Sequence, residues 1–231
     1  IVAQYRQDIS KYTLDKKTKV TNIFDRIPSQ LDDKTRRFKL SSIEQNARLR
    51  EYEDSFVWLQ DAGVALPCYN LSEPKAPLKI NEQSRLFKLF MNDCGLLCAM
   101  GLENLQFDIL QGNLSANMGG ILENVFAEQL KSNGFSLRYL NKRTIGELDF
   151  VVQRAGKIIP IEIKSGKDYK AHRALENALG VKEWKLDEGI VFCQGNMEQD
   201  KKVVYLPWYM VMFFKQIDLN GMKVELDIQN I

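Results

Sequence analysis

Histidine and cysteine are scarce in this chain of 231 residues, which contains one histidine and four cysteines. The cysteines, at positions 68, 94, 98 and 193, follow no spacing typical of a zinc site, and only His172 is available to join them. We therefore expect reduced thiols and no zinc centre. His172 itself, a lone histidine at the start of an expected helix, is more typical of a cap or a surface residue than of a catalytic group.

Long hydrophobic runs are also missing. The longest apolar stretches, such as residues 209–214, are far shorter than the roughly 20 residues needed to cross a bilayer, and no secretory signal opens the sequence. We expect a cytoplasmic protein with no membrane partner. Because the pattern is already helical at Ile1, we also expect the chain to be a piece of a longer protein.

Net charge is small, at +2, which gives little overall attraction to nucleic acid. The charge is uneven, however, because residues 1–50 contain twelve Lys and Arg against six Asp and Glu. If the protein binds a polyanion, the amino-terminal half is therefore the expected platform.

Apolar spacing predicts helices in the amino-terminal half over residues 2–12, 20–31 and 86–100. Ser41 and Glu44 form a capping box, which predicts the start of a long helix that ends at Gly63. Residues 64–71 and 77–80 are expected to be short strands around a turn.

The element order of a winged helix is three helices followed by a hairpin. It matches the helices expected over residues 2–12, 20–31 and 41–63 and the two strands that follow them. We therefore predict a helical winged-helix-like domain over residues 1–110, with the boundary inside residues 101–117. Such a domain reads DNA or serves packing and protein docking, and the second interpretation is favoured because no cluster of Arg, Lys and Asn marks a groove-reading helix.

The second half, residues 111–231, is predicted to be an α/β domain with a mixed sheet. Its expected elements are a helix (121–130), three strands (137–140, 147–153 and 157–164), a helix (175–186), a strand (189–193) and a closing segment (203–214) that is extended before Pro207 and helical after it.

Two acidic residues are predicted to meet in a hairpin of this domain. A two-residue loop at Ala155 and Gly156 would pair Arg154 with Lys157, and the same register sets Asp149 opposite Glu162. Carboxylates held side by side repel unless a cation lies between them or one is protonated. Mg²⁺, which prefers oxygen ligands and keeps several waters, is the expected cofactor, with Asp149 and Glu162 as its ligands.

Lys164 lies two residues after Glu162 on the same strand face, where an ammonium group could orient water or stabilise charge on a phosphate. Glu123 flanks the apolar stripe of the helix at 121–130 and is a further candidate ligand or base. Glu147 could pair with Lys164. The plain alternative is a solvated strand face closed by weak ion pairs.

The segments GELDFVV (residues 146–152) and IIPIEIKSG (158–166) resemble the PD-(D/E)XK nuclease superfamily, which is restriction-endonuclease-like. LQDAG (59–63), FKLFMNDCGLL (87–97) and LEN (122–124) resemble a domain of unknown function found at the carboxy end of prokaryotic AAA-type ATPases. The superfamily has a proline before its aspartate, whereas this chain has Leu148.

The resemblance implies that Asp149 and Glu162 are metal ligands, Lys164 is the catalytic lysine and Glu123 is the acidic residue on the helix. It also implies an upstream ATPase domain outside this chain. Residues 165–168 lack the upstream glycine and the Ser or Thr of a P-loop, so no ATPase site is expected here.

The leading hypothesis is thus magnesium-dependent hydrolysis of DNA phosphodiesters by a nuclease-like domain behind a winged-helix-like domain. The rival is a non-catalytic module that docks protein or recognises nucleic acid for an ATPase.

Overall fold

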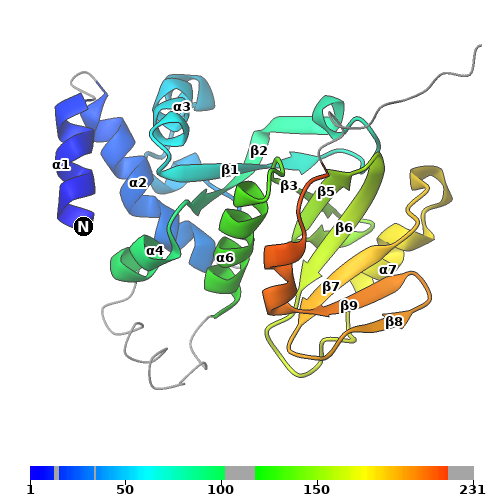
Figure 1. Cartoon of the computed structure of the whole chain (residues 1–231). Coiled ribbons are helices and arrows are strands. Elements are labelled where there is room, and N and C mark those ends of the chain that lie inside the picture. The colour runs from blue at the N-terminus through cyan, green and yellow to red at the C-terminus, as the bar shows by residue number, and fades with distance from the viewer. Residues whose placement is uncertain (13–15, 34, 102–117, 218–231) are drawn as a thin grey trace, which may run out of the picture.

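The computed structural model describes residues 1–12, 16–33, 35–101 and 118–217. Helices and two mixed sheets make up the chain, which confirms the predicted α/β class. In Figure 1 the amino-terminal helices form one side of the molecule and a five-stranded sheet forms the other. Helix α6 (Met118–Ser132) stands between them.

The amino-terminal part contains helices, a long hairpin and short 3-10 turns. The helices are α1 (Val2–Tyr12), α2 (Lys17–Asp32), α3 (Glu53–Asp61) and α4 (Cys94–Gly101), the strands are β1 (Ala65–Leu71) and β2 (Glu82–Met91), and the turns are η1 (Leu40–Ser42), η2 (Leu49–Glu51) and η3 (Leu78–Asn81). The first two predicted helices and the first predicted strand are confirmed. Gly63, with φ +68°, follows the end of α3 as expected.

The predicted long helix between residues 41 and 63 is confirmed only over α3, which begins at Glu53, and is wrong for the residues before it. The capping-box pair lies in and just after η1, and the extended Arg48 (φ −104°, ψ 135°) separates η1 from η2. Leu40, Ile43 and Leu49 pack against the core from these separate turns. Their apolar spacing therefore reflects tertiary packing and not a continuous helix.

The predicted strand at 77–80 and the predicted helix at 86–100 also differ from the structure. Residues 78–81 form η3, and residues 86–91 belong to β2, so that only α4 is helical. Residues 87–91 are all buried, because this end of β2 is covered on both faces. A continuous apolar run has no period, so it does not distinguish strand from helix. Residues 102–117 of the predicted boundary, and the division after residue 110, lie outside the described residues.

The carboxy-terminal part begins with α6 and continues with β3 (Arg138–Lys142), β4 (Gly146–Leu148), β5 (Phe150–Arg154), β6 (Lys157–Ile163), α7 (Arg173–Gly180), η4 (Lys182–Trp184), β7 (Gly189–Cys193), β8 (Glu198–Asp200), β9 (Val203–Pro207) and η5 (Trp208–Phe213). The predicted elements are found, except that the expected single strand at 147–153 is broken at Asp149 and the helix expected over 175–186 ends at Gly180. Strand β8 was not predicted.

The two sheets have strand orders β2-β1-β3-β4 and β5-β6-β7-β9-β8. Strand β1 pairs antiparallel with β2 and parallel with β3, so the first sheet contains strands from both sides of the segment at residues 102–117. In the second sheet β6, β7 and β9 are parallel, and the outer strands β5 and β8 are antiparallel to their neighbours.

One apolar core joins the amino-terminal helices to the second sheet. The Phe90 and Phe150 rings lie 5.7 Å apart, and Phe126 of α6 lies 4.9 Å from Phe192 of β7. Helix α7 covers the other face, where a Cβ on Gly189 would lie 2.6 Å from the Leu175 side chain. Within the described ranges, no helix is long and apolar enough to cross a membrane.

Candidate functional site

The β5–β6 hairpin has the predicted register. Its loop residues Ala155 and Gly156 have φ of +47° and +80°, which suits a tight two-residue turn. Arg154 pairs with Lys157, and the ladder continues without a shift to the pair formed by Phe150 and Ile161. This register therefore brings Asp149, the residue before Phe150, to the same end of the hairpin as Glu162, the residue after Ile161.

Asp149 lies at the break between β4 and β5 and not in the ladder. Its Oδ2 accepts a hydrogen bond of 2.7 Å from the Ile163 N–H. The expected direct strand pair with Glu162 is therefore not formed, although Asp149 lies beside the strand that carries Glu162. The carboxylate satisfies a backbone donor where the antiparallel pairing stops.

Glu162 in β6 and Lys164, which directly follows this strand, lie on the same side, as predicted. Glu162 is buried, and its Oε2 lies 2.8 Å from Lys164 Nζ. The Lys164 carbonyl accepts a hydrogen bond of 3.1 Å from Trp208 Nε1, and its N–H donates to the Phe192 carbonyl. Lys164 is thus fixed by its backbone, while its partly exposed side chain forms an ion pair with Glu162.

Glu123 is buried on the core side of α6, and its partner is Lys88 of β2. The Lys88 Nζ lies 2.6 Å from Glu123 Oε1 and 2.7 Å from Glu147 Oε1. Arg36 forms an ion pair with the other oxygen of Glu123. Lys88 is completely buried and also lies over the Tyr139 ring. The predicted pairing of Glu147 with Lys164 is therefore wrong: Glu147 pairs with Lys88.

These residues form one charge cluster, with carboxylates at Glu123, Glu147, Asp149 and Glu162 and cations at Arg36, Lys88 and Lys164. Lys88, Glu123 and Glu162 are buried, and the other members are half-buried. Desolvation and then the charge of Glu123 raise the pKa of Asp149 to about 7, against the opposing charge of Lys88. Desolvation alone would lower the pKa of Lys88, but Glu123, Glu147 and Asp149 outweigh it and raise that pKa. Lys88 is therefore a buried ammonium ion, and Asp149 exchanges its proton near neutral pH.

The expected magnesium ligands are already used by neighbouring groups. Glu162 faces the Lys164 ammonium, and Asp149 accepts a backbone hydrogen bond. In the part of the chain that the structure describes, no group of three or more His, Cys, Asp or Glu side chains is placed to hold a metal ion. As arranged, Glu162 is paired with the Lys164 ammonium, so Mg²⁺ would have to displace this lysine to bind there.

Lys88 and Arg36 are the residues of this cluster that sequence reasoning missed. A signal for Lys88 exists, since it is a single charge inside the apolar run at residues 86–91. A buried lysine requires a carboxylate partner, but the pattern does not identify that partner. Arg36 lies in a polar stretch and carries no comparable signal.

The other candidate residues lie elsewhere. His172 is buried, and its Nε2 lies 2.6 Å from the Tyr205 hydroxyl. Among the aromatic side chains of the second half, Trp184 and Tyr205 are buried in the core around α7, whereas Tyr209 is exposed. His172 does precede the first residue of α7, but the expected role as a cap or surface residue is wrong, because its side chain is buried and makes no capping hydrogen bond.

Comparison with known families divides the chain near the segment at 102–117. Residues 1–106 match the family model described as "Domain of unknown function (DUF8612)", and residues 118–210 match the one described as "Domain of unknown function (DUF4143)". No curated protein and no solved structure matches the chain. The second match includes Glu123, Asp149, Glu162 and Lys164, whereas Lys88 lies in the first. The charge cluster therefore joins the two matched segments.

Proposed function

We propose that this chain is a non-catalytic accessory module that binds a partner and whose charge cluster fastens its two matched segments together. The observation that carries this proposal is Lys88, which has no exposed surface and bridges Glu123 and Glu147 at 2.6 and 2.7 Å. Removing one member of such a network leaves uncompensated charge, so the cluster stabilises the folded chain.

Electrostatics support the same function. A metal ion bound at Asp149 and Glu162 would add positive charge beside Lys88 and Lys164, which already neutralise much of the cluster. Lysine donates three hydrogen bonds and needs no dehydration of a metal, so it is an effective permanent counter-ion for carboxylates. The cluster is thus suited to a structural role.

The wider setting is also part of the proposal. Glu123 lies on a helix, Asp149 lies between β4 and β5, and Glu162 and Lys164 lie at the end of β6. This order supports a PD-(D/E)XK-like scaffold after residue 117, and the helices before β1 support a winged-helix-like origin for the first part. From the sequence resemblance we further propose a cytoplasmic protein in which an AAA-type ATPase domain precedes this chain.

A magnesium-dependent DNA endonuclease is the second candidate. It is favoured by the hydrogen bond between Asp149 and Ile163, which brings the aspartate beside the strand that carries Glu162 and Lys164. For this function, Mg²⁺ would have to reorganise the ion pairs of the cluster, with Asp149 and Glu162 as its ligands and DNA as the substrate.

Calorimetric titration of Mg²⁺ and Mn²⁺ separates the two candidates. The wild type, Asp149→Asn, Glu162→Gln and the exposed control Glu198→Gln are compared, and each is then incubated with plasmid and single-stranded DNA. We expect no saturable binding that depends on Asp149 or Glu162, and intact DNA. Saturable binding that both site variants lose and the control keeps, together with metal-dependent nicking, would replace the accessory function with the nuclease.

A further inference from the structure

Two aromatic rings project from η5 into solvent. Tyr209 is 60% exposed and Phe213 is 66% exposed, whereas Val211 between them is 4% exposed and packs in the core. In this 3-10 turn, which starts after Pro207, Val211 faces the core and the two rings face solvent. Large flat side chains so exposed on a soluble protein indicate a contact surface.

Hydrogen bonds fix this aromatic segment to the body of the protein. Asn133, just after α6, donates through its side chain to the carbonyls of Val211 (2.7 Å) and Phe214 (3.0 Å). At the start of the segment, Trp208 donates to the Lys164 carbonyl. Just after its end, Arg154 donates to the Lys215 carbonyl. The backbone that carries the rings is therefore fixed before any ligand binds, which lowers the entropy cost of binding.

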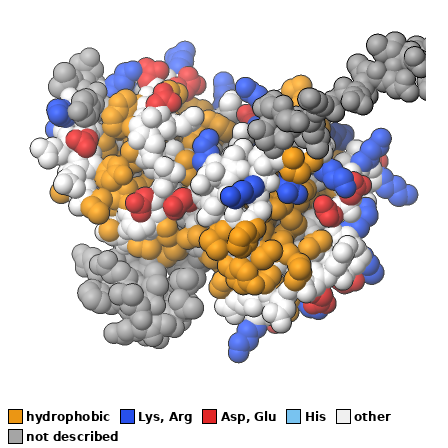
Figure 2. Space-filling model, in the orientation of Figure 1, with side chains coloured by type: hydrophobic (Ala, Val, Ile, Leu, Met, Phe, Trp, Pro, Cys, Tyr) orange, Lys and Arg blue, Asp and Glu red, His pale blue; other side chains and the backbone are white. Residues whose placement is uncertain are grey.

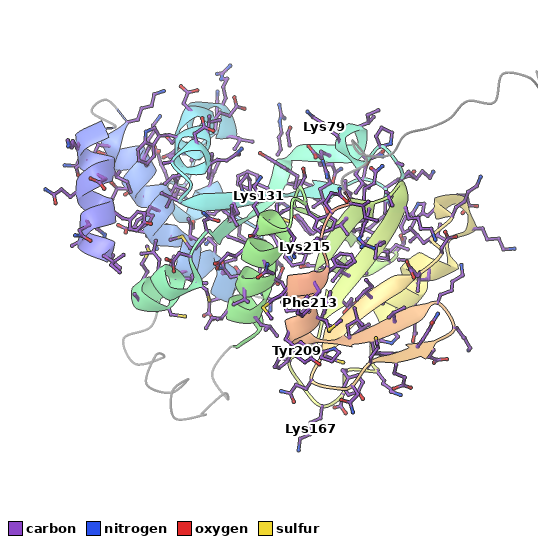
Figure 3. All side chains as sticks on the ribbon, in the orientation of Figure 1. Lys79, Lys131, Lys167, Tyr209, Phe213 and Lys215 are labelled. Carbon is purple, nitrogen blue, oxygen red and sulfur yellow. The ribbon has the colours of Figure 1, made fainter. Side chains whose placement is uncertain are left out.

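Exposed lysines continue the line of the two rings. Figure 3 shows Lys79, Lys131 and Lys215 on one side of Phe213 and Tyr209, and Lys167 on the other, along one face of the molecule. All four lysines are exposed, and no Asp or Glu occurs from residue 201 to residue 217. Figure 2 shows a hydrophobic patch in the middle of the same face, with basic side chains above and below it.

Hollows connect the basic end of this line. Lys79 and Lys131 border a hollow of about 530 Å³. An adjoining hollow of about 270 Å³ shares Ser136 and Arg138 with the first and reaches Gln216. The first also contains Asp61 and Glu82. Glu82 is paired with Arg138 at 2.6 Å, so its charge is already compensated.

From this arrangement we infer that the face formed by Tyr209, Phe213 and the four lysines binds single-stranded nucleic acid. Bases of any sequence stack on exposed rings, and phosphates bind lysines placed along the same path. The elongated shape favours a linear polyanion. A protein partner fits less well, because lysine is depleted in the cores of protein interfaces. This inference rests on the proposed binding function and names its ligand class.

The test is fluorescence anisotropy with a labelled oligothymidine of about 20 nucleotides, longer than the roughly 4–16 nucleotides that one compact binding fold covers. EDTA is present throughout, so the assay is independent of any metal site. We expect saturable binding whose affinity falls between about 50 and about 200 mM salt, by roughly 0.7 log unit per log unit of salt for each lysine–phosphate contact.

Variants locate the surface. Lys131→Glu combined with Lys215→Glu should lower affinity at least roughly tenfold and flatten the salt dependence, whereas Lys17→Glu combined with Lys182→Glu, on other surfaces, should change affinity far less. Tyr209→Ala and Phe213→Ala should each lower it roughly tenfold, whereas the exposed control Met197→Ala should not. Circular dichroism confirms that each variant is folded.

Three outcomes would overturn the inference: no binding at the lower salt concentration, equal binding by the ring variants and the wild type, or displacement of the oligothymidine by poly-glutamate of equal charge. The last would indicate an acidic protein as the partner. None of these outcomes decides between the accessory module and the nuclease, which the metal titration tests separately.

Discussion

Lys88 and Glu123 are 35 residues apart in the sequence, yet their charged groups lie 2.6 Å apart in the interior. One comes from a strand of the first sheet and the other from α6, and the contact is closed to solvent on both sides. The stability of the protein, the pKa of Asp149 and the attachment of the two matched segments to each other all depend on this pair.

Lys88→Met should destabilise the protein by about 3–5 kcal/mol, because the buried Glu123 and the half-buried Glu147 would then lack their shared counter-ion. Urea unfolding followed by circular dichroism measures the loss, with the exposed Lys182→Met as the matched control. The double variant Lys88→Met, Glu123→Gln should lose less than the sum of the single losses, because the neutral amide no longer needs the ammonium. A loss below about 1 kcal/mol for Lys88→Met would contradict the role given to this lysine.

Asp149 should make the protein less stable as pH rises toward neutral. Its pKa in the folded protein is about 7, above the ordinary value of 3.8, so folding takes up a proton between these values. The stability contributed by that proton is complete below pH 3.8 and is lost as pH rises through about 7. The unfolding free energy of the wild type minus that of Asp149→Asn should therefore fall across this window. The exposed Asp168→Asn should show the same pH dependence of the unfolding free energy as the wild type. A difference between the wild type and Asp149→Asn that rises with pH would contradict this prediction.

Asn133→Asp should loosen η5, because the aspartate keeps the size of the side chain but cannot donate to the Val211 and Phe214 carbonyls. We expect a loss of about 1–3 kcal/mol and faster hydrogen exchange at the amides of residues 208–214. The neighbouring Ser132→Ala should leave exchange in this segment unchanged. Unaltered exchange in Asn133→Asp would mean that other contacts fix η5.

Cys98 should be the fastest-reacting cysteine. A hydrogen bond with the Cys94 thiol lowers the pKa of Cys98 to about 7, while the same bond raises that of Cys94. Burial raises the pKa of Cys68 and that of Cys193. Alkylation with iodoacetamide, read by peptide mass spectrometry, should label Cys98 first with a midpoint near pH 7, and Cys94→Ala should move that midpoint upward. Equal labelling rates for all four cysteines would contradict this.

The sequence by itself determined the β5–β6 hairpin and most of its surroundings. Ala155 and Gly156 both adopt positive φ in a two-residue turn that sets the register, and the register fixes which residues of the two strands are neighbours. The shared face of Glu162 and Lys164 and the helix that carries Glu123 follow from local periodicity, which needs no knowledge of the rest of the chain.

Tertiary structure alone decided what these carboxylates contact. Residues 86–91 have no readable period, and they form a strand because the core covers both of their faces. Only that strand brings Lys88 to Glu123 and Glu147, and only the end of the ladder at Phe150 turns Asp149 toward the Ile163 N–H. Local spacing fixes neighbours within a hairpin, whereas partners from distant segments are fixed by packing of the whole chain.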